Sequence, residues 1–479
     1  MTNPAAAREL GSFRAKFFLA VGSIGWGVKD AGITGLLLLF YSQIVGVPAQ
    51  LVGLAIGAAL VVDAVVDPII GIVSDNWRSR WGRRLPFMYA AAFPVGLTYF
   101  FLWQPPAWSP REQFEYLLVL VVLARMFIAL FEIPSSALIP ELTSDYTKRT
   151  AFLNWRWFMG VLGAAFIGYV SLRFILVPDQ THPIGQLNPA GYPLYALVAS
   201  TIMTLSILIS CLGLHRYTPH FLQPAPRYVT VRQFAGEILR TLRLKSFRIL
   251  TISGFLSSAA IGLAGALGPI LLTYYWKLNN AQIAPFSLAT VIGALFAFII
   301  FVPLAKLFEK KIAAIVTSII SIAAGTGPYV FALSGWTPDV AAKPELLLVL
   351  LGLFALFAAM GITASVLVGS MMADVVDQGA IDTGRRSEGT FFAAISLVSK
   401  ASSGIGVFLG GMITDIAGLP AHAVPSAVDA HILERLLWLY VPSVILLHAG
   451  AIYAFSRFGI SRRHHEENRR RLDGQVEIL

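Results

Sequence analysis

The fold of this chain is decided by residues 47–73, which read VPAQLVGLAIGAALVVDAVVDPIIGIV. The stretch is apolar apart from Gln50 near its start and from Asp63 and Asp67, and it exceeds the ~20 residues that a helix needs to cross a bilayer. A carboxylate at the centre of such a helix costs roughly 2.5–3.5 kcal/mol on insertion scales. Two acids four residues apart share one helix face. The pair predicts a cation or proton site in a transporter, with a structural salt bridge to a basic residue inside the membrane as the alternative.

The composition extends this prediction to the whole chain. The sequence of 479 residues is 56% hydrophobic and 13% charged, and its mean hydropathy is +0.71. These values predict an integral membrane protein, and the alternating polarity of membrane barrels is absent. The net charge of +10 lies in alternate loops, which argues against a nucleic-acid partner. The single Cys211 excludes a disulfide framework, and the polar start at 1–16 leads into a full span, so no signal peptide is expected.

Hydropathy windows of about 19 residues predict twelve spans, at 15–43, 48–73, 85–104, 113–138, 152–177, 191–214, 247–276, 283–305, 311–333, 345–372, 388–418 and 432–457. The basic connector divides them into two sets of six. The predicted parts are an N-terminal half at 1–214, a cytoplasmic connector at 215–246, a C-terminal half at 247–458 and a basic cytoplasmic tail at 459–479. This all-α membrane layout of two six-helix halves is typical of the major facilitator fold, in which the halves rock about a central site.

The orientation follows from the basic residues, which gather in the loops after the second, fourth, sixth, eighth and tenth spans and in the tail. The intervening loops carry few of them. By the positive-inside rule both termini are predicted to be cytoplasmic. We expect a monomer in the plasma membrane, of the bacterial inner-membrane type, in contact with membrane lipid.

A motif at the end of the second span predicts a gate. Gly71 and Asp75 precede the run Arg78-Ser-Arg-Trp-Gly-Arg83-Arg84. Gly71 permits close helix approach, and Asp75 can accept from a neighbouring helix N-terminus or pair with an arginine. A merely basic cytoplasmic loop is the alternative.

A second pair of acids predicts cytoplasmic closure contacts in the C-terminal half. Asp374 and Asp377 end the tenth predicted span, and Arg385 and Arg386 precede the eleventh. Simple helix-end capping is the alternative.

Charged residues inside the spans form the candidate ion and solute site. Pro68 follows Asp67 and prevents normal hydrogen bonding to the carbonyl four residues earlier, which leaves a backbone oxygen near the carboxylates. Lys29 and Asp30 lie in the middle of the first span and point about 100° apart, so we expect that they do not pair with each other. Asp30 is predicted to accept from solute hydroxyls, and Trp26 to supply either an apolar platform or simple packing.

Further charges lie on other spans. Arg125 and Glu132 share one face of the fourth span, Arg156 lies early in the fifth, and Lys400 lies midway along the eleventh. Buried ions need partners, so these bases can match the acids. The network predicts a transport pathway, with helix–helix cross-linking as the alternative.

These residues resemble the melibiose permease-like glycoside–pentoside–hexuronide:cation symporters of the major facilitator superfamily, over nearly the whole chain. The matching pieces are Asp63-Ala-x-x-Asp67-Pro68-x-x-Gly71, Arg78-Ser-Arg-Trp-Gly82, Glu132-Ile-Pro134, Pro140-Glu-Leu-Thr143, Ala373-Asp-Val-Val-Asp377-x-Gly379 and Lys400. The resemblance implies cation-coupled symport by alternating access. It implies cation binding at Asp63 and Asp67 with Lys400 nearby, a joint cation and sugar role for Glu132, and sugar contacts at Lys29, Asp30 and Arg156.

Departures from the family pattern bear on the ion and the solute. Val66 and Ala129 stand where a sodium-using relative has Asn and Thr, so two neutral oxygen donors are lost and proton coupling is favoured over sodium. Ser136 and Ser365 replace the aromatic residues that flank its sugar. The solute is predicted to be a sugar or glycoside, with a lysolipid-like amphipathic solute as the alternative.

Other classes of protein have less support. No Ser/His/Asp set, phosphate-binding glycine loop or metal-ligand spacing occurs in the spans. We therefore expect no enzyme activity, no cofactor beyond the coupling ion and no metal site. A membrane receptor with a carrier fold that does not transport is the remaining alternative.

Overall fold

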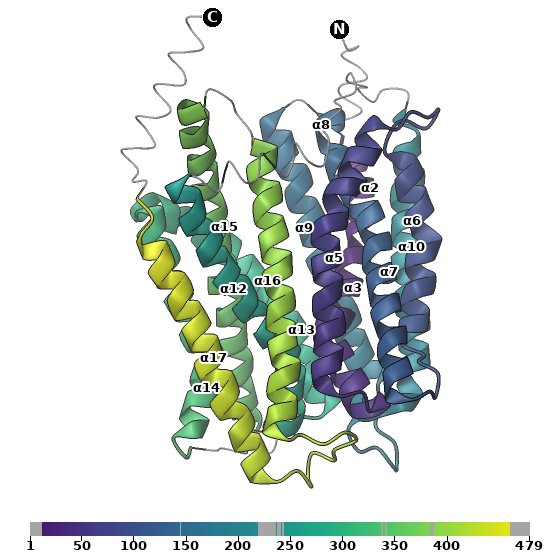
Figure 1. The fold of residues 1–479 in the computed structure, drawn as a ribbon, viewed down its shortest axis with the longest axis vertical. Coiled ribbons are helices and arrows are strands. Elements are labelled where there is room, and N and C mark those ends of the chain that lie inside the picture. Colours follow the sequence, from purple (N-terminus) through teal and green to yellow (C-terminus); the bar gives the residue numbers. More distant parts are fainter. Residues whose placement is uncertain are drawn as a thin grey trace, which may run out of the picture. The chain divides into compact units, whose positions relative to one another are not determined.

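The structure is a computed structural model that describes residues 12–143, 145–218, 236, 241, 244–336, 339–340, 343–383 and 388–459. The described residues form helices and connecting loops, without a strand among them (Figure 1). Eleven helices are long and apolar enough to cross a membrane, or up to twelve if one bent pair counts as a single span. The predicted all-α, twelve-span fold is therefore confirmed.

Two compact units emerge from the contacts between residues. Unit 1 comprises residues 1–229, 265–287 and 407–428, and unit 2 comprises 230–264, 288–406 and 429–479. Unit 1 therefore includes two segments that the sequence places in the C-terminal half. The division into halves at 214 and 247 stays a prediction.

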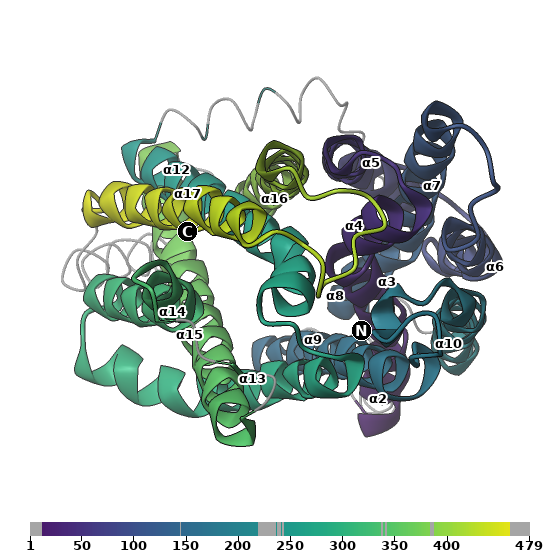
Figure 2. The same ribbon diagram turned by 90° about the horizontal axis from the view of Figure 1, so that it is seen from below.

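Unit 1 is built from most of the N-terminal helices. They are α2 (Phe13–Val21), α3 (Ser23–Gly35), α4 (Leu37–Leu39), the π-helix η1 (Phe40–Val45), α5 (Ala49–Asn76), α6 (Leu85–Leu102), α7 (Pro110–Ala137), α8 (Ile139–Leu142), α9 (Tyr146–Val170), the π-helix η2 (Ser171–Ile175), the 3-10 helices η3 (Gly185–Leu187) and η4 (Pro189–Gly191), and α10 (Tyr192–His215). Helix α3 packs against α9, and α7 packs against both α5 and α6. The end-on view of Figure 2 shows α5, α6 and α7 side by side.

The remaining helices are divided between the units or lie in unit 2, except the π-helix at Leu271–Tyr275, which lies in unit 1. They are α12 (Lys245–Ile270), the π-helix η6 (Leu271–Tyr275), α13 (Asn280–Leu307), α14 (Lys310–Leu333), α15 (Pro344–Thr383), α16 (Glu388–Ala417) and α17 (Ala430–Ser456). In unit 2, α14 packs against α15 and α17. Part of its apolar core forms around Phe247, Leu367 and Phe391.

Two predicted spans differ from the observed helices. The first, predicted as one span at 15–43, is bent by 43° between Gly35 and Leu37, because Leu36 leaves the helical region with φ −124°. The tenth was predicted to end at 372, but α15 continues to Thr383. Hydropathy cannot find this helix end, because the polar residues after 372 keep the helical backbone.

Candidate functional site

A buried ion pair joins α5 to α7. Helix α5 is rich in Ala, Val and Leu and carries Asp63 on a buried face. The Asp63 carboxylate lies 2.7 Å from the Arg125 guanidinium and accepts a hydrogen bond of 2.8 Å from Arg125 Nε. Both side chains are almost fully buried. The salt bridge that was the alternative for Asp63 is therefore formed, and the partner of Asp63 is Arg125, a base of the predicted transport pathway.

Asp67 lies one turn further along α5 and is half-buried. Residues at i and i+4 share a helix face, so Asp67 extends the acidic face that begins at Asp63. Pro68, inside the helix, lacks the N–H that would bond the carbonyl of Ala64.

Helix α3 carries an ion pair between adjacent residues. Lys29 Nζ lies 2.6 Å from Asp30 Oδ1, so the prediction that these two charges do not pair is wrong. The four-carbon lysine side chain is flexible enough to span the angular offset between neighbours on the helix. The Lys29 side chain is 6% exposed and that of Asp30 is 42% exposed, so this acid keeps a face open to a ligand.

Trp26 packs on α9, the neighbour of α3. A Cβ atom added at Gly160 would lie 2.4 Å from the Trp26 ring, so the indole rests directly on the α9 backbone. This contact gives Trp26 a packing role in the present conformation, and the platform role remains a prediction.

Arg156 links α9 to the C-terminal part of α7. Its Nη2 donates to Ser135 Oγ at 2.9 Å and to the Glu132 carbonyl at 3.5 Å. Ser135 Oγ in turn donates to the same carbonyl. Sequence reasoning missed Ser135; the Pro-Ser-Ser run after Glu132 was its available signal.

The middle of α3, α5, α7 and α9 carries both acidic and basic side chains. Away from their ends, these helices carry the acids Asp30, Asp63, Asp67 and Glu132 and the bases Lys29, Arg125 and Arg156. A membrane interior penalises net charge. Charged groups at this depth mark a candidate site for an ion or a polar solute.

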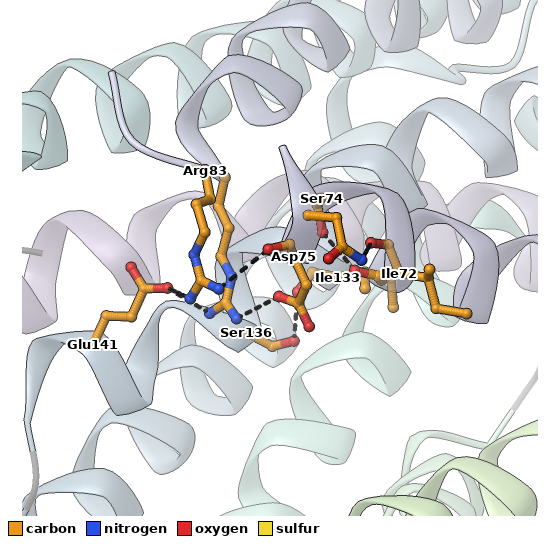
Figure 3. Close-up of polar contacts among 10 residues, drawn as sticks. Ile72, Ser74, Asp75, Arg83, Ile133, Ser136 and Glu141 are labelled. Atoms are coloured by element: carbon orange, nitrogen blue, oxygen red, sulfur yellow. Dashed lines mark hydrogen bonds and ion pairs between the residues drawn. The ribbon is translucent and has the colours of Figure 1, made fainter. Parts of the chain in front are cut away.

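The arginine-rich loop forms a second ionic cluster (Figure 3). Arg84 Nη2 lies 2.7 Å from Asp75 Oδ1, and Arg83 donates to the Asp75 carbonyl. Arg83 also pairs with Glu141 of α8, which lies 3.4 Å from Arg84. Both arginines and Glu141 are buried. The structure thus brings together the predicted gate residues Asp75, Arg83 and Arg84. It adds Glu141, which the sequence offered only as part of the motif Pro140-Glu-Leu-Thr143.

Gly71 makes no unusually close contact. A Cβ atom there would meet Ile133 at 3.8 Å, an ordinary van der Waals distance. The close helix approach expected at Gly71 is therefore not formed in this conformation.

The site residues of unit 2 are only partly described. Asp374 pairs with Lys310 at the start of α14, with 3.0 Å between Nζ and Oδ2. Asp377 lies on α15 before its end, so helix-end capping does not describe it. Arg385 and Arg386 lie outside the described residues. Lys400 lies half-buried on α16.

The described part of the chain has no group of three or more His, Cys, Asp or Glu residues arranged to hold a metal.

Known proteins resemble this chain over nearly its full length. It is 26% identical to an uncharacterized symporter of Synechocystis sp., with 99% of both chains covered. It is 24% identical to the isoprimeverose transporter of Lactiplantibacillus pentosus, over 92% of this chain and 88% of that relative.

A solved transporter has the same fold. The inward-open xylose transporter XylE from E. coli gives a TM-score of 0.63 at 15% identity and covers 94% of this chain and 96% of that one. A family model described as MFS/sugar transport protein matches residues 18–462. The chain therefore belongs to the MFS/sugar transport protein family.

Proposed function

We propose that this chain is a secondary active transporter that couples entry of a cation to symport of a sugar or glycoside by alternating access. The observation that carries the proposal is the pair of acids one turn apart on the apolar helix α5, the buried Asp63 and the half-buried Asp67. Relatives named as an isoprimeverose transporter and a lactose permease support a sugar as the solute. Asp30, with its half-exposed carboxylate, is suited to accept hydrogen bonds from sugar hydroxyls.

We propose the proton as coupling ion. Val66 and Ala129 supply no side-chain oxygen, so a sodium ion would lack two neutral ligands there. Removing the charge of Asp63 would leave the buried Arg125 without its counterion, which is strongly destabilising. We therefore assign the transported proton to Asp67 or Glu132. The bound proton neutralises one carboxylate inside the membrane, which lowers the cost of moving that charge as the bundle changes conformation.

Uptake in proteoliposomes tests this proposal. A panel of monosaccharides, disaccharides, glycosides, uronic acids and lysolipids is offered under an imposed pH gradient, with and without sodium. At 1:1 coupling a difference of one pH unit supports about tenfold accumulation, because it corresponds to about 1.4 kcal/mol. Accumulation that requires sodium contradicts proton coupling, accumulation of lysolipids alone contradicts a sugar solute, and binding without counterflow identifies a receptor.

Matched variants separate the coupling acids from surface acids. Asp67→Asn and Glu132→Gln are expected to lose gradient-driven accumulation, with some solute exchange retained. Glu115→Gln changes an exposed acid of the same helix as Glu132 and is expected to transport normally. The coupling role assigned to α5 fails if active uptake survives both Asp63→Asn and Asp67→Asn.

A further inference from the structure

An acid of α16 caps the first turn of α5. Asp415 Oδ1 accepts from the N–H of Ala49 at 3.1 Å, and Oδ2 accepts from the N–H of Gln50 at 2.8 Å. Pro48, at the N-cap position of α5, has no side-chain acceptor. The first N–H groups of a helix need such acceptors, and the helix dipole stabilises a negative charge placed at this end. The first turn of α5 is therefore completed by a residue 366 positions away in the sequence.

The backbones of α5 and α16 touch beside this cap. A Cβ atom at Gly411 would lie 2.2 Å from the Ala49 carbonyl, and one at Gly53 would lie 2.9 Å from the Val407 carbonyl. Side chains other than hydrogen do not fit at these distances. The glycines thus allow the contact, and Asp415 supplies charged hydrogen bonds across it.

Other polar contacts gather at the same end of unit 1, which we call the distal end because it lies opposite the arginine-rich loop 78–84. Tyr274 donates to Gln43 Oε1 at 2.9 Å and to the Ala423 carbonyl at 3.1 Å. Figure 2 views this end, where the loop after α16 passes beneath α4. Gln186 donates to Thr273 Oγ1 at 3.1 Å.

These contacts explain why residues 265–287 and 407–428 belong to unit 1. The contacts of Asp415 with α5, of Tyr274 with Gln43 and of Gln186 with Thr273 join a segment of the predicted N-terminal half to a segment of the predicted C-terminal half. The contacts hold these segments together at the distal end in this conformation, and an alternating-access carrier that opens at this end must break them.

We propose that Asp415 is a positioning residue for the transport cycle: its ionic cap on α5 holds the distal end closed, and its release accompanies opening. The proposal rests on the alternating access proposed above. Helix α5 also carries Asp63, 14 residues or about 21 Å from Ala49. A change at the distal cap therefore acts on the helix that carries the coupling acids.

Cysteine accessibility tests whether the Asp415 cap, which we call the latch, holds the distal end closed, and it does so without measuring transport. Cys211 is the only cysteine and is buried, so Cys211→Ala gives a cysteine-free background. Thr273, which is fully buried at the distal end, becomes the reporter as Thr273→Cys with a membrane-impermeant maleimide. Asp415→Asn is expected to raise the labelling rate by about two- to thirty-fold, the range spanned by loss of a helix cap. Asp415→Glu, which keeps the charge, is expected to restore part of the closure.

Asp429→Asn is the matched control. Asp429 also caps a helix, but it accepts from His431 of its own helix α17. Its replacement is expected to leave the labelling rate of Thr273→Cys unchanged. The role proposed for Asp415 is overturned if Asp415→Asn labels at the same rate as the parent protein, which carries Cys211→Ala and Thr273→Cys alone. An increase in Asp429→Asn as large as that in Asp415→Asn also overturns it.

A cross-link provides an independent measurement if Asp415→Asn does not fold. Oxidation of Gln50→Cys with Asp415→Cys joins the two helices at the distal end. The cross-linked protein is expected to lose transport and to regain it on reduction. Transport at the full rate while cross-linked overturns the proposal. Increased labelling without uptake of any solute supports the latch while contradicting the symport function.

Discussion

At the scale of single residues, the buried charges decide how α5 is held. Asp63 and Arg125 are each other's partner inside the bundle. The desolvation cost of such a pair can match its Coulombic gain, but removal of one partner leaves an uncompensated charge. The energetic signature of the pair is therefore the difference between single and double variants.

We predict that Arg125→Gln alone destabilises the protein by about 3–5 kcal/mol, while Arg125→Gln combined with Asp63→Asn costs clearly less. Thermal unfolding in detergent measures both. The exposed pair Arg111–Glu115 serves as control, and its loss is expected to cost at most about 1 kcal/mol. Additive effects at Asp63 and Arg125 would contradict their coupling.

Asp179 predicts a pH dependence in the loop after η2. Hydrogen bonds from the Thr181 hydroxyl and the His182 backbone lower the pKa of Asp179 from 3.8 to about 2. A depressed pKa in the folded loop contributes stability above the unfolded pKa, and this contribution is lost as the pH falls toward 2. Hydrogen exchange of the Thr181 and His182 amides, corrected for intrinsic rates, is expected to be constant above about pH 4 and faster below it. Asp179→Ala should remove this dependence.

At the scale of elements, close backbone approach fixes the pairing of α3 with α9. A Cβ atom at Gly163 would lie 2.8 Å from the Ile24 carbonyl. Backbone cannot yield as a side chain does, so the two helices must separate to admit a methyl group.

Gly163→Ala is therefore expected to destabilise the protein by about 1–3 kcal/mol, the usual cost of overpacking. Gly352→Ala on α15 is the control, because nothing lies within 4 Å of its added Cβ. Unfolding midpoints in detergent compare the two. A Gly163→Ala variant as stable as Gly352→Ala would show that the helices do not meet this closely.

At the scale of the whole molecule, the predicted orientation has a direct chemical test. In the Cys211→Ala background, Arg80→Cys lies in the arginine-rich loop and Gln180→Cys in a loop at the distal end. Both parent side chains are exposed. An impermeant maleimide added to intact cells is expected to label Gln180→Cys, and to label Arg80→Cys only after permeabilisation. The reverse pattern would invert the orientation.

The sequence predicts the number of spans well, because a bilayer requires long apolar helices whatever their partners. Hydropathy does not predict which side chains pair across two helices. The pairing of Asp63 with Arg125, the burial of Glu141 beside Arg83 and the bend at Leu36 all depend on how helices meet. Lys29 and Asp30 show a further limit, because side-chain flexibility overrides the backbone angle that separates them.

The cap on α5 also has a consequence for biogenesis. Helix α5 is synthesised early, whereas Asp415 is added 366 residues after Ala49. The first turn of α5 thus lacks its carboxylate through most of synthesis. A chain truncated before α16 should fray at that turn, and maturation of this helix finishes only when translation is nearly complete.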